Sequence, residues 1–162
     1  MPASTLALLR RCVALWSPIT RALKNLQDPA ALLARAYVAE AFFRSGLTKI
    51  RDWDTTLALF ADEYHVPLLS PGAAAVMGTA GELVLPVLLM LGLGGRFAAL
   101  GLSVVNVVAV LSLSEIAPAA LQQHVTWGVL LAGLAIHGVG RWSLDCALVA
   151  PALRRSKHGN KS

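Results

Sequence analysis

The stretch that decides the fold runs from residue 73 to residue 113, AAAVMGTAGELVLPVLLMLGLGGRFAALGLSVVNVVAVLSL. Its only charged side chains are Glu82 and Arg96, and the run GLGG at 92–95 divides it into two halves. A helix needs about 20 mainly apolar residues to cross the hydrocarbon core of a bilayer, and each half has roughly that length. The stretch therefore predicts two membrane-spanning helices joined by a tight turn, over about 73–93 and 96–113.

Two more apolar segments flank this pair. The segment at about 31–50 is less clean, because it contains Arg35, Glu40 and Arg44, whereas the segment at about 124–140 is mostly apolar. We expect residues 114–123 to form a short loop before the last span. The predicted fold is thus all-α, a bundle of four transmembrane helices.

The composition supports a membrane protein. Of the 162 residues, 56% are hydrophobic and only 14% are charged. Soluble domains average about 45–50% apolar and about 25% charged residues. The net charge is +5, but the basic residues sit between and beside apolar runs instead of clustering on one polar face. This pattern argues against a nucleic-acid partner and favours anchoring at an anionic lipid surface.

The segments outside the four spans divide the chain. Residues 1–26 mix apolar and basic side chains at helical spacing, which predicts a basic amphipathic helix on the membrane, broken near Pro18. A disordered basic tail is the alternative for this segment. The stretch 51–71 is too polar to span, so we expect a short interfacial helix capped by Asp54 and ended by Pro67 and Pro71. The membrane domain is then 27–150, and 151–162 form a basic polar tail.

The distribution of Lys and Arg predicts the orientation. With four spans, both termini and the 92–95 turn share one side, which holds most of the basic residues. These are Arg10, Arg11, Arg21, Lys24, Arg96, Arg141, Arg154, Arg155, Lys157 and Lys161. The opposite side holds only Lys49 and Arg51, among acidic residues. Because short cytoplasmic loops are enriched in Lys and Arg, we expect a multi-pass protein of the inner (plasma) membrane with both termini cytoplasmic.

Polar side chains inside the spans are the candidates for a functional site. An ionisable group at membrane depth costs at least about 2.5–3.5 kcal/mol, so it needs a partner, water or a ligand. The predicted intramembrane polar site comprises Arg35, Glu40, Arg44, Glu82, Asn106 and His124. In the first span, Arg35 and Lys49 share a face, while Glu40 and Arg44 are spaced to pair with each other. The alternative is that Arg35 and Lys49 reach opposite interfaces and that the Glu40–Arg44 pair is structural.

Glu82 follows Ala74 and Gly78 at intervals of one turn, and such small residues mark a face that packs closely on other helices. We therefore expect Glu82 to point into the bundle, where it binds a cation, relays protons, contacts a polar head group, or pairs with Arg35 or Arg96. Asn106, with Ser103, is expected to hydrogen-bond across helices. Nothing near His124 supplies a second ligand at motif spacing, and Cys12 and Cys146 form no Cys-x-x-Cys pair, so no metal site is predicted.

Three stretches carry a family resemblance: LLARAYVAEAFFRSGLTKI at 32–50, TAGELVLPVLLMLGLGGRFAALGL at 79–102 and HVTWGVLLAGLAIHGVGRWSLD at 124–145. The chain resembles the DoxX family of small four-helix membrane proteins. The shared features are an early Arg (Arg35), a closing Gly-x-x-Lys (Gly46, Lys49), the buried Glu82, and a final Ser-Leu-Asp ending at Asp145. The resemblance implies a link to quinone-reducing oxidases, and hence a possible quinone.

The expected function is that of a non-catalytic accessory subunit of a membrane redox system, quinone-linked, or of a metal-handling system. Motifs of soluble enzymes, such as Walker A, GxSxG and HExxH, are absent, so we do not expect the chain to be an enzyme by itself. Expected partners are the lipid bilayer and a redox or metal-handling protein, and a homodimer is possible. Two alternatives stay open: a small transporter or carrier working as a dimer, and a structural assembly factor.

Overall fold

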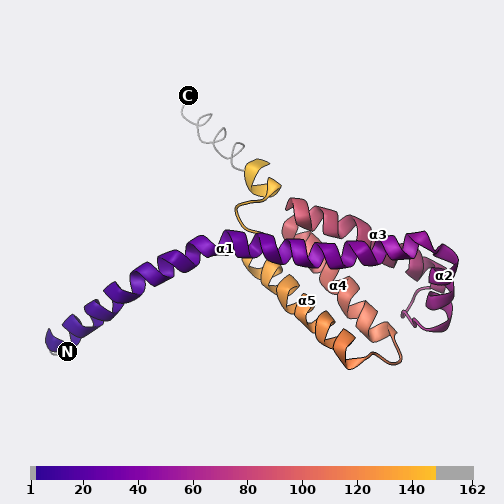
Figure 1. Ribbon diagram of the computed structural model, residues 1–162, viewed down its shortest axis with the longest axis horizontal. Coiled ribbons are helices and arrows are strands. Elements are labelled where there is room, and N and C mark those ends of the chain that lie inside the picture. The colour runs from indigo at the N-terminus through magenta and orange to yellow at the C-terminus, as the bar shows by residue number, and fades with distance from the viewer. Residues whose placement is uncertain (1–2, 149–162) are drawn as a thin grey trace.

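The computed structural model describes residues 3–148, with side chains from Trp16 onward. Its elements, in chain order, are the helices α1 (Ala3–Arg51), α2 (Trp53–Asp62), α3 (Pro71–Leu91), α4 (Gly95–Ser112) and α5 (Pro118–His137) (Figure 1). Residues 3–148 contain no strand, only an isolated bridge between Tyr64 and Leu113. The predicted all-α class is confirmed, while the predicted tail at 151–162 lies outside the described residues.

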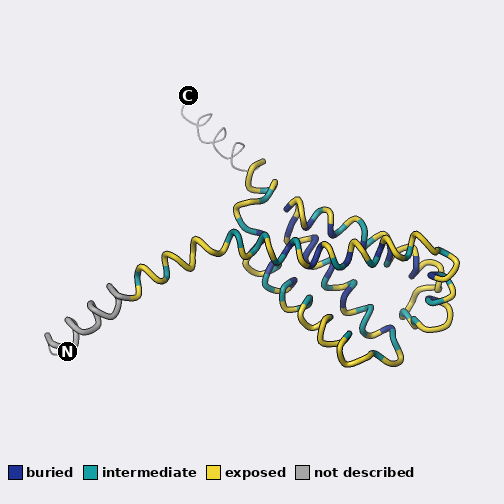
Figure 2. The backbone as a smooth tube through the Cα atoms, in the orientation of Figure 1, coloured by how far each residue is buried: buried dark blue, intermediate teal, exposed yellow. Residues whose placement is uncertain are grey.

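The first helix differs from its prediction. Residues 3–51 form one continuous helix that contains both Pro18 and Pro29, so the expected break near Pro18 is wrong. A proline inside a helix removes one backbone hydrogen bond, and the bonds around it hold the two parts together here. The part of α1 from residue 31 onward packs on the other helices, whereas residues 16–29, which we call the arm, project away from them and are largely exposed (Figure 2).

The short helix predicted after the first span is present as α2. Its N-cap is Asp52, not the expected Asp54, and the Asp52 carboxylate accepts a 3.0 Å hydrogen bond from the Thr55 amide. The helix ends at Asp62, before either proline. Pro71 does not end α2, because it occupies the first turn of α3 behind the N-cap Ser70. That position tolerates proline, which has no amide hydrogen to leave unpaired.

The last three helices and the second half of α1 pack as a closed ring, α1 on α3, α3 on α4, α4 on α5 and α5 on α1. Gly92 and Gly94 take positive φ angles of 68° and 53° in the turn between α3 and α4. The last helix starts at Pro118 instead of the predicted His124, again with proline in the first turn. The core between the helices is apolar and includes Val38, Phe42, Leu89, Leu102 and Leu131.

Within residues 3–148, three helices, α3, α4 and α5, are long and apolar enough to cross a membrane. Their outward faces carry large apolar side chains that are more than half exposed, among them Val84, Val104, Val129 and Ile136. Such a continuous apolar exterior fits contact with lipid and not with water.

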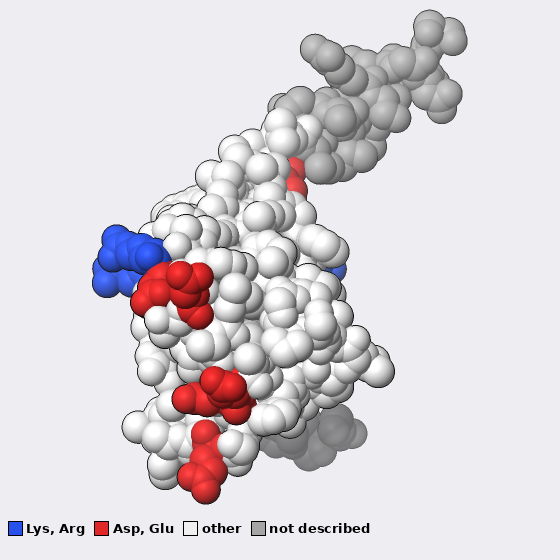
Figure 3. All heavy atoms as spheres, turned by 90° about the vertical axis from the view of Figure 1, so that its right-hand side faces the viewer, with Lys and Arg blue, Asp and Glu red and all other residues white. Residues whose placement is uncertain are grey.

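The two ends of the helix ring differ. One end carries α2, the segment 63–70 and the α4–α5 connection, while the other carries the α3–α4 turn and residues 138–148 (Figure 1). The α2 end presents patches of acidic groups to solvent (Figure 3). Its exposed acids are Asp52, Asp54, Asp62, Glu63 and Glu115.

Candidate functional site

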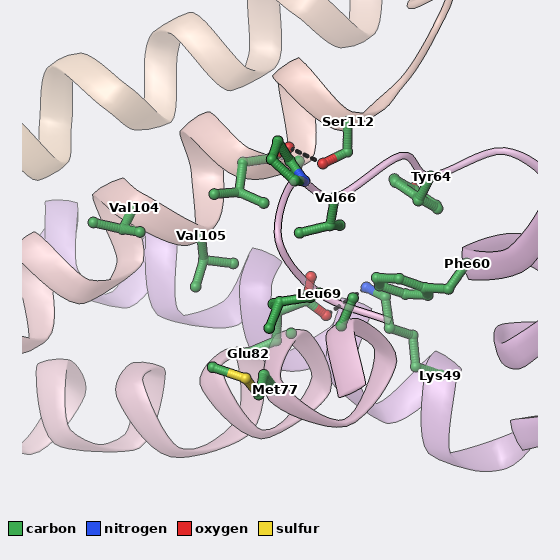
Figure 4. A pocket seen from close by; sticks show the side chains of 15 residues that line it. Lys49, Phe60, Tyr64, Val66, Leu69, Met77, Glu82, Val104, Val105 and Ser112 are labelled. Carbon is green, nitrogen blue, oxygen red and sulfur yellow. Dashed lines mark hydrogen bonds and ion pairs between the residues drawn. The ribbon is translucent and has the colours of Figure 1, made fainter. Parts of the chain in front are cut away.

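A pocket of about 430 Å³ opens beside α2, between α3 and α4. Most of its lining is apolar and comes from α2, the segment 64–69, α3 and α4; it includes Phe60, Val66, Met77, Val104, Val105 and Val108. Four polar side chains join this lining: those of Lys49, Tyr64, Glu82 and Ser112. Figure 4 shows Glu82 and Lys49 on the side of α3 and α1, with Val66 and Ser112 across the pocket. An apolar cavity of this size with few polar groups is typical of a site for a small lipophilic molecule.

Lys49 and Glu82 form an ion pair at this pocket. The Lys49 Nζ lies 2.5 Å from the Glu82 Oε2 and 2.9 Å from the Ser45 Oγ, one turn earlier on α1. Both side chains are mostly buried, with 19% and 10% of their surfaces exposed. The pair is thus partly desolvated and faces an apolar space, so its charges are available to a polar group that enters the pocket.

The helices α1 and α3 meet closely beside this pair. A Cβ atom on Gly46 would lie 2.9 Å from the Leu83 side chain and 3.2 Å from the Glu82 Cβ, so no larger residue fits without movement. Small residues allow helix backbones to approach in this way. Gly46 therefore brings α1 near enough to α3 for Lys49 to reach Glu82.

Tyr64 borders the pocket on the α2 side. Its ring stacks on Phe60 with centroids 4.9 Å apart. Burial raises the pKa of the Tyr64 hydroxyl, and the negative charges of Glu82 and Glu63 raise it further. The hydroxyl consequently keeps its proton at neutral pH and can act as a hydrogen-bond donor.

Arg35 lies at the opposite end of the helix ring and does not reach the pocket. Its guanidinium is buried and donates to the carbonyl oxygens of Leu89 (2.9 Å), Val139 (2.8 Å), Trp142 (2.8 Å) and Met90. Carbonyls in the last turn of a helix have no partner within the helix. Arg35 therefore ties the end of α3 to the segment after α5.

Asp145 stabilises the same end. Its two carboxylate oxygens accept hydrogen bonds from the amides of Gly94 (2.9 Å) and Gly95 (3.0 Å), at the start of α4. These two bonds lower the pKa of the Asp145 carboxyl. The Ser-Leu-Asp motif that ends here thus caps a helix that lies far away in the sequence.

Asn106 and His124 form a separate contact between α4 and α5. The Asn106 Nδ2 donates to the His124 carbonyl at 2.9 Å, and the His124 Nδ1 lies 2.8 Å from the Asn106 Oδ1. The expected interhelical bond of Asn106 is therefore present, whereas Ser103 bonds to Ala99 in its own helix. Among residues 16–148, no group of three His, Cys, Asp or Glu side chains is arranged to hold a metal ion.

Glu40 and Arg44 pair with each other at 2.7 Å, as their spacing predicts, but on the outward face of α1. Their side chains are 61% and 77% exposed. The six residues predicted as one intramembrane site are thus distributed over four places, and only Glu82 borders the pocket. Glu82 is buried as expected, yet its partner is Lys49, not Arg35 or Arg96.

Lys49 and Tyr64 are not among the predicted site residues. For Lys49 a signal existed, because it closes the Gly-x-x-Lys motif and shares a helical face with buried Phe42 and Gly46. Tyr64 gave no comparable signal, since its position depends on how the segment after α2 folds back toward α4.

These features define a small all-helical membrane protein with an apolar pocket that holds one ion pair. Comparison with family models matches residues 30–115 to the DoxX family. The match covers more than half of the 162 residues and includes Arg35, Lys49 and Glu82, and the chain belongs to the DoxX family. Comparison with curated proteins and with solved structures gave no match.

Proposed function

We propose that this DoxX-family protein is a non-catalytic accessory subunit of a membrane redox system, and that its pocket holds the head group of a quinone. The observation that carries the proposal is the Lys49–Glu82 pair, which faces an otherwise apolar cavity of about 430 Å³. A quinone matches this combination of apolar and polar groups, because it has an apolar ring and tail and two carbonyl oxygens. A quinone would supply the exchange of two electrons and two protons with the partner protein that carries the redox centre.

The residues of the pocket fit such a molecule. The Lys49 ammonium and the protonated Tyr64 hydroxyl are donors for carbonyl oxygens, and the Glu82 carboxylate is an acceptor for a hydroxyl. The side chains of Met77, Val104 and Val105 would contact the ring and the start of the tail. A metal-handling role receives less support, because the polar groups of the pocket include only one carboxylate and no His or Cys.

The same proposal places the protein in the inner (plasma) membrane with four spans. Besides α3, α4 and α5, residues 31–51 of α1 would cross, because this segment packs antiparallel to α3 over its length and lies at the same depth. Both termini would be cytoplasmic, since Arg21, Lys24, Arg96 and Arg141 lie at one end and the acidic residues of α2 at the other. Labelling of single cysteines from outside the cell tests this: a site in α2 should react and a site at residues 92–94 should not.

The first experiment is native mass spectrometry of the protein, extracted gently from its own membranes. A bound quinone, or a stoichiometric partner with a flavin, haem or iron–sulfur centre, is the expected result. A protein that carries only ordinary phospholipid and no redox partner, over a range of mild detergents, would contradict the accessory-subunit proposal.

A further inference from the structure

The outward face of α1 carries a seam that runs along the arm and the packed part of the helix without a change of register. In the arm, the seam consists of Trp16, Ile19, Leu23 and Leu26, which are 48–61% exposed. The spacing alternates between three and four residues, which is the repeat of a two-stranded coiled coil. The opposite face of the arm carries Arg21, Lys24 and Asn25.

The same alternation continues past Ala30 through the packed part of α1. The seam positions there are Leu33, Tyr37, Glu40, Arg44, Leu47 and Arg51, and every one of them is exposed. The buried side chains of α1, Arg35, Phe42 and Lys49 among them, lie on the other side of the helix. One face of α1 therefore packs on its own helix ring, while the side chains of the seam are exposed in the monomer.

In both parts of α1, the polarity of the exposed seam side chains does not match that of the neighbouring surface. The arm extends beyond the ends of α3 and α5 and offers large apolar side chains (Figures 1 and 2). Beside the apolar helices α3 and α5, the seam instead offers the charged side chains of Glu40 and Arg44. A charged pair exposed to lipid and an apolar stripe exposed to water both favour coverage by another helix.

The charges indicate what covers the seam. Glu40 and Arg44 are one turn apart and carry opposite charges. In a parallel pair related by a two-fold axis, each faces its own copy within a layer, and the adjacent layer of the second chain offers the opposite charge. In a parallel pair of α1 helices, adjacent layers would bring each Glu40 near the Arg44 of both chains. The four charges would then neutralise one another between the two helices.

We propose that the chain forms a parallel homodimer through this seam, from Trp16 to Arg51. The second copy covers the apolar stripe of the arm and the Glu40–Arg44 pair together. The helix ring of each protomer lies on the outside of the paired α1 helices, so the α2–α3–α4 pocket stays open. The inference does not depend on what the pocket binds.

Disulfide trapping in native membranes tests the seam, in the full chain with Cys12→Ala and Cys146→Ala. Leu23→Cys (arm) and Leu47→Cys (packed part) are seam variants; Asn25→Cys and Val107→Cys are their exposed controls. We expect at least about fivefold more disulfide dimer from each seam variant than from its control, because seam positions meet their own copies across the axis. Equal trapping at seam and control positions would overturn the proposal. Trapping at Leu47 but not at Leu23 would also overturn it, and would indicate that the arm lies on lipid instead.

Charge complementation tests the contact between chains. Glu40→Gln and Arg44→Gln should each weaken the dimer, measured by energy transfer between labelled copies in lipid bilayers. A mixture of the two variants should recover part of the signal, since the mixed dimer regains one Glu40–Arg44 contact between chains. If Glu40 and Arg44 contact each other only within a chain, neither variant has a complete pair, and mixing them restores nothing. An energy-transfer signal from the mixture that is no higher than that of each variant alone would overturn the dimer through this seam.

Discussion

The Lys49 ammonium lies 2.5 Å from the Glu82 carboxylate, between two helices that Gly46 brings into close contact. This pair is the polar centre of a pocket whose other walls are almost entirely apolar. A buried pair of this kind can serve stability, ligand binding or both, and substitutions separate these roles.

Removing one partner of the pair should destabilise the fold more than removing both. Lys49→Met or Glu82→Leu leaves one buried charge without its partner, and each should lower the free energy of unfolding by about 3 kcal/mol. The double variant Lys49→Met/Glu82→Leu should recover most of this loss, because two apolar side chains fit an apolar pocket. Unfolding in mixed detergent micelles measures all three variants; additive losses would show that the pair does not act as a unit.

Arg35→Met should be severely destabilising without changing the pocket. The substitution removes the guanidinium donors from the carbonyls of Val139, Met90 and Trp142, and from that of Leu89, which keeps its bond from the Gly92 amide. We expect a loss of at least about 3 kcal/mol, measured by unfolding, since each unpaired buried group costs about 1–3 kcal/mol. Arg141→Ala is the control, because Asp28 contacts the Arg141 backbone amide and not its side chain. Equal stability of the two variants would refute this role for Arg35.

Asp145→Asn should lower stability at neutral pH and have little effect in acid. The pKa of the carboxyl is lowered in the folded state by the Gly95 and Gly94 amides. Its contribution is therefore present above the unfolded pKa, near 3.9, and is lost as the pH falls through the lower folded pKa. We expect a loss of about 1 kcal/mol at pH 7, because an asparagine side chain has a single oxygen and can accept only one of the two amide hydrogen bonds. A stability difference that stays constant from pH 7 to pH 2 would argue against the carboxylate cap.

Asn106→Leu should weaken the contact between α4 and α5. Both hydrogen bonds to His124 would be lost, and we expect a decrease of about 1 kcal/mol, since bonds between membrane helices average about 0.6 kcal/mol each. Ser103→Ala is the matched control, because Ser103 bonds only within α4. Thermal unfolding in lipid nanodiscs compares the two variants, and equal melting temperatures would show that the bonds contribute nothing.

The helices and the family could be predicted from the sequence, because long apolar runs and small-residue spacing are local signals. The continuity of α1 could not be predicted, because a proline disfavours helix locally, whereas the hydrogen bonds of the flanking turns keep the helix continuous. The contacts of Arg35 and Glu82 depend on partners far along the chain. Arg35 binds carbonyls of residues 89, 90, 139 and 142, and backbone acceptors leave no trace in a sequence pattern. Spacing predicted that Glu40 and Arg44 pair away from Arg35, but packing decided that their face of α1 points outward and that the partner of Asn106 is His124.

The measurement that tests the account most directly is photolabelling with an azido-quinone in lipid nanodiscs, read by peptide mass. We predict that labelling of the wild-type protein is concentrated on the pocket segments of α3 and α4, near Met77 and Val104. The folded double variant Lys49→Met/Glu82→Leu should lose this labelling. Labelling spread evenly over the lipid-facing surfaces of α3, α4 and α5, and unchanged in the double variant, would contradict the claim that the pocket binds a quinone head group.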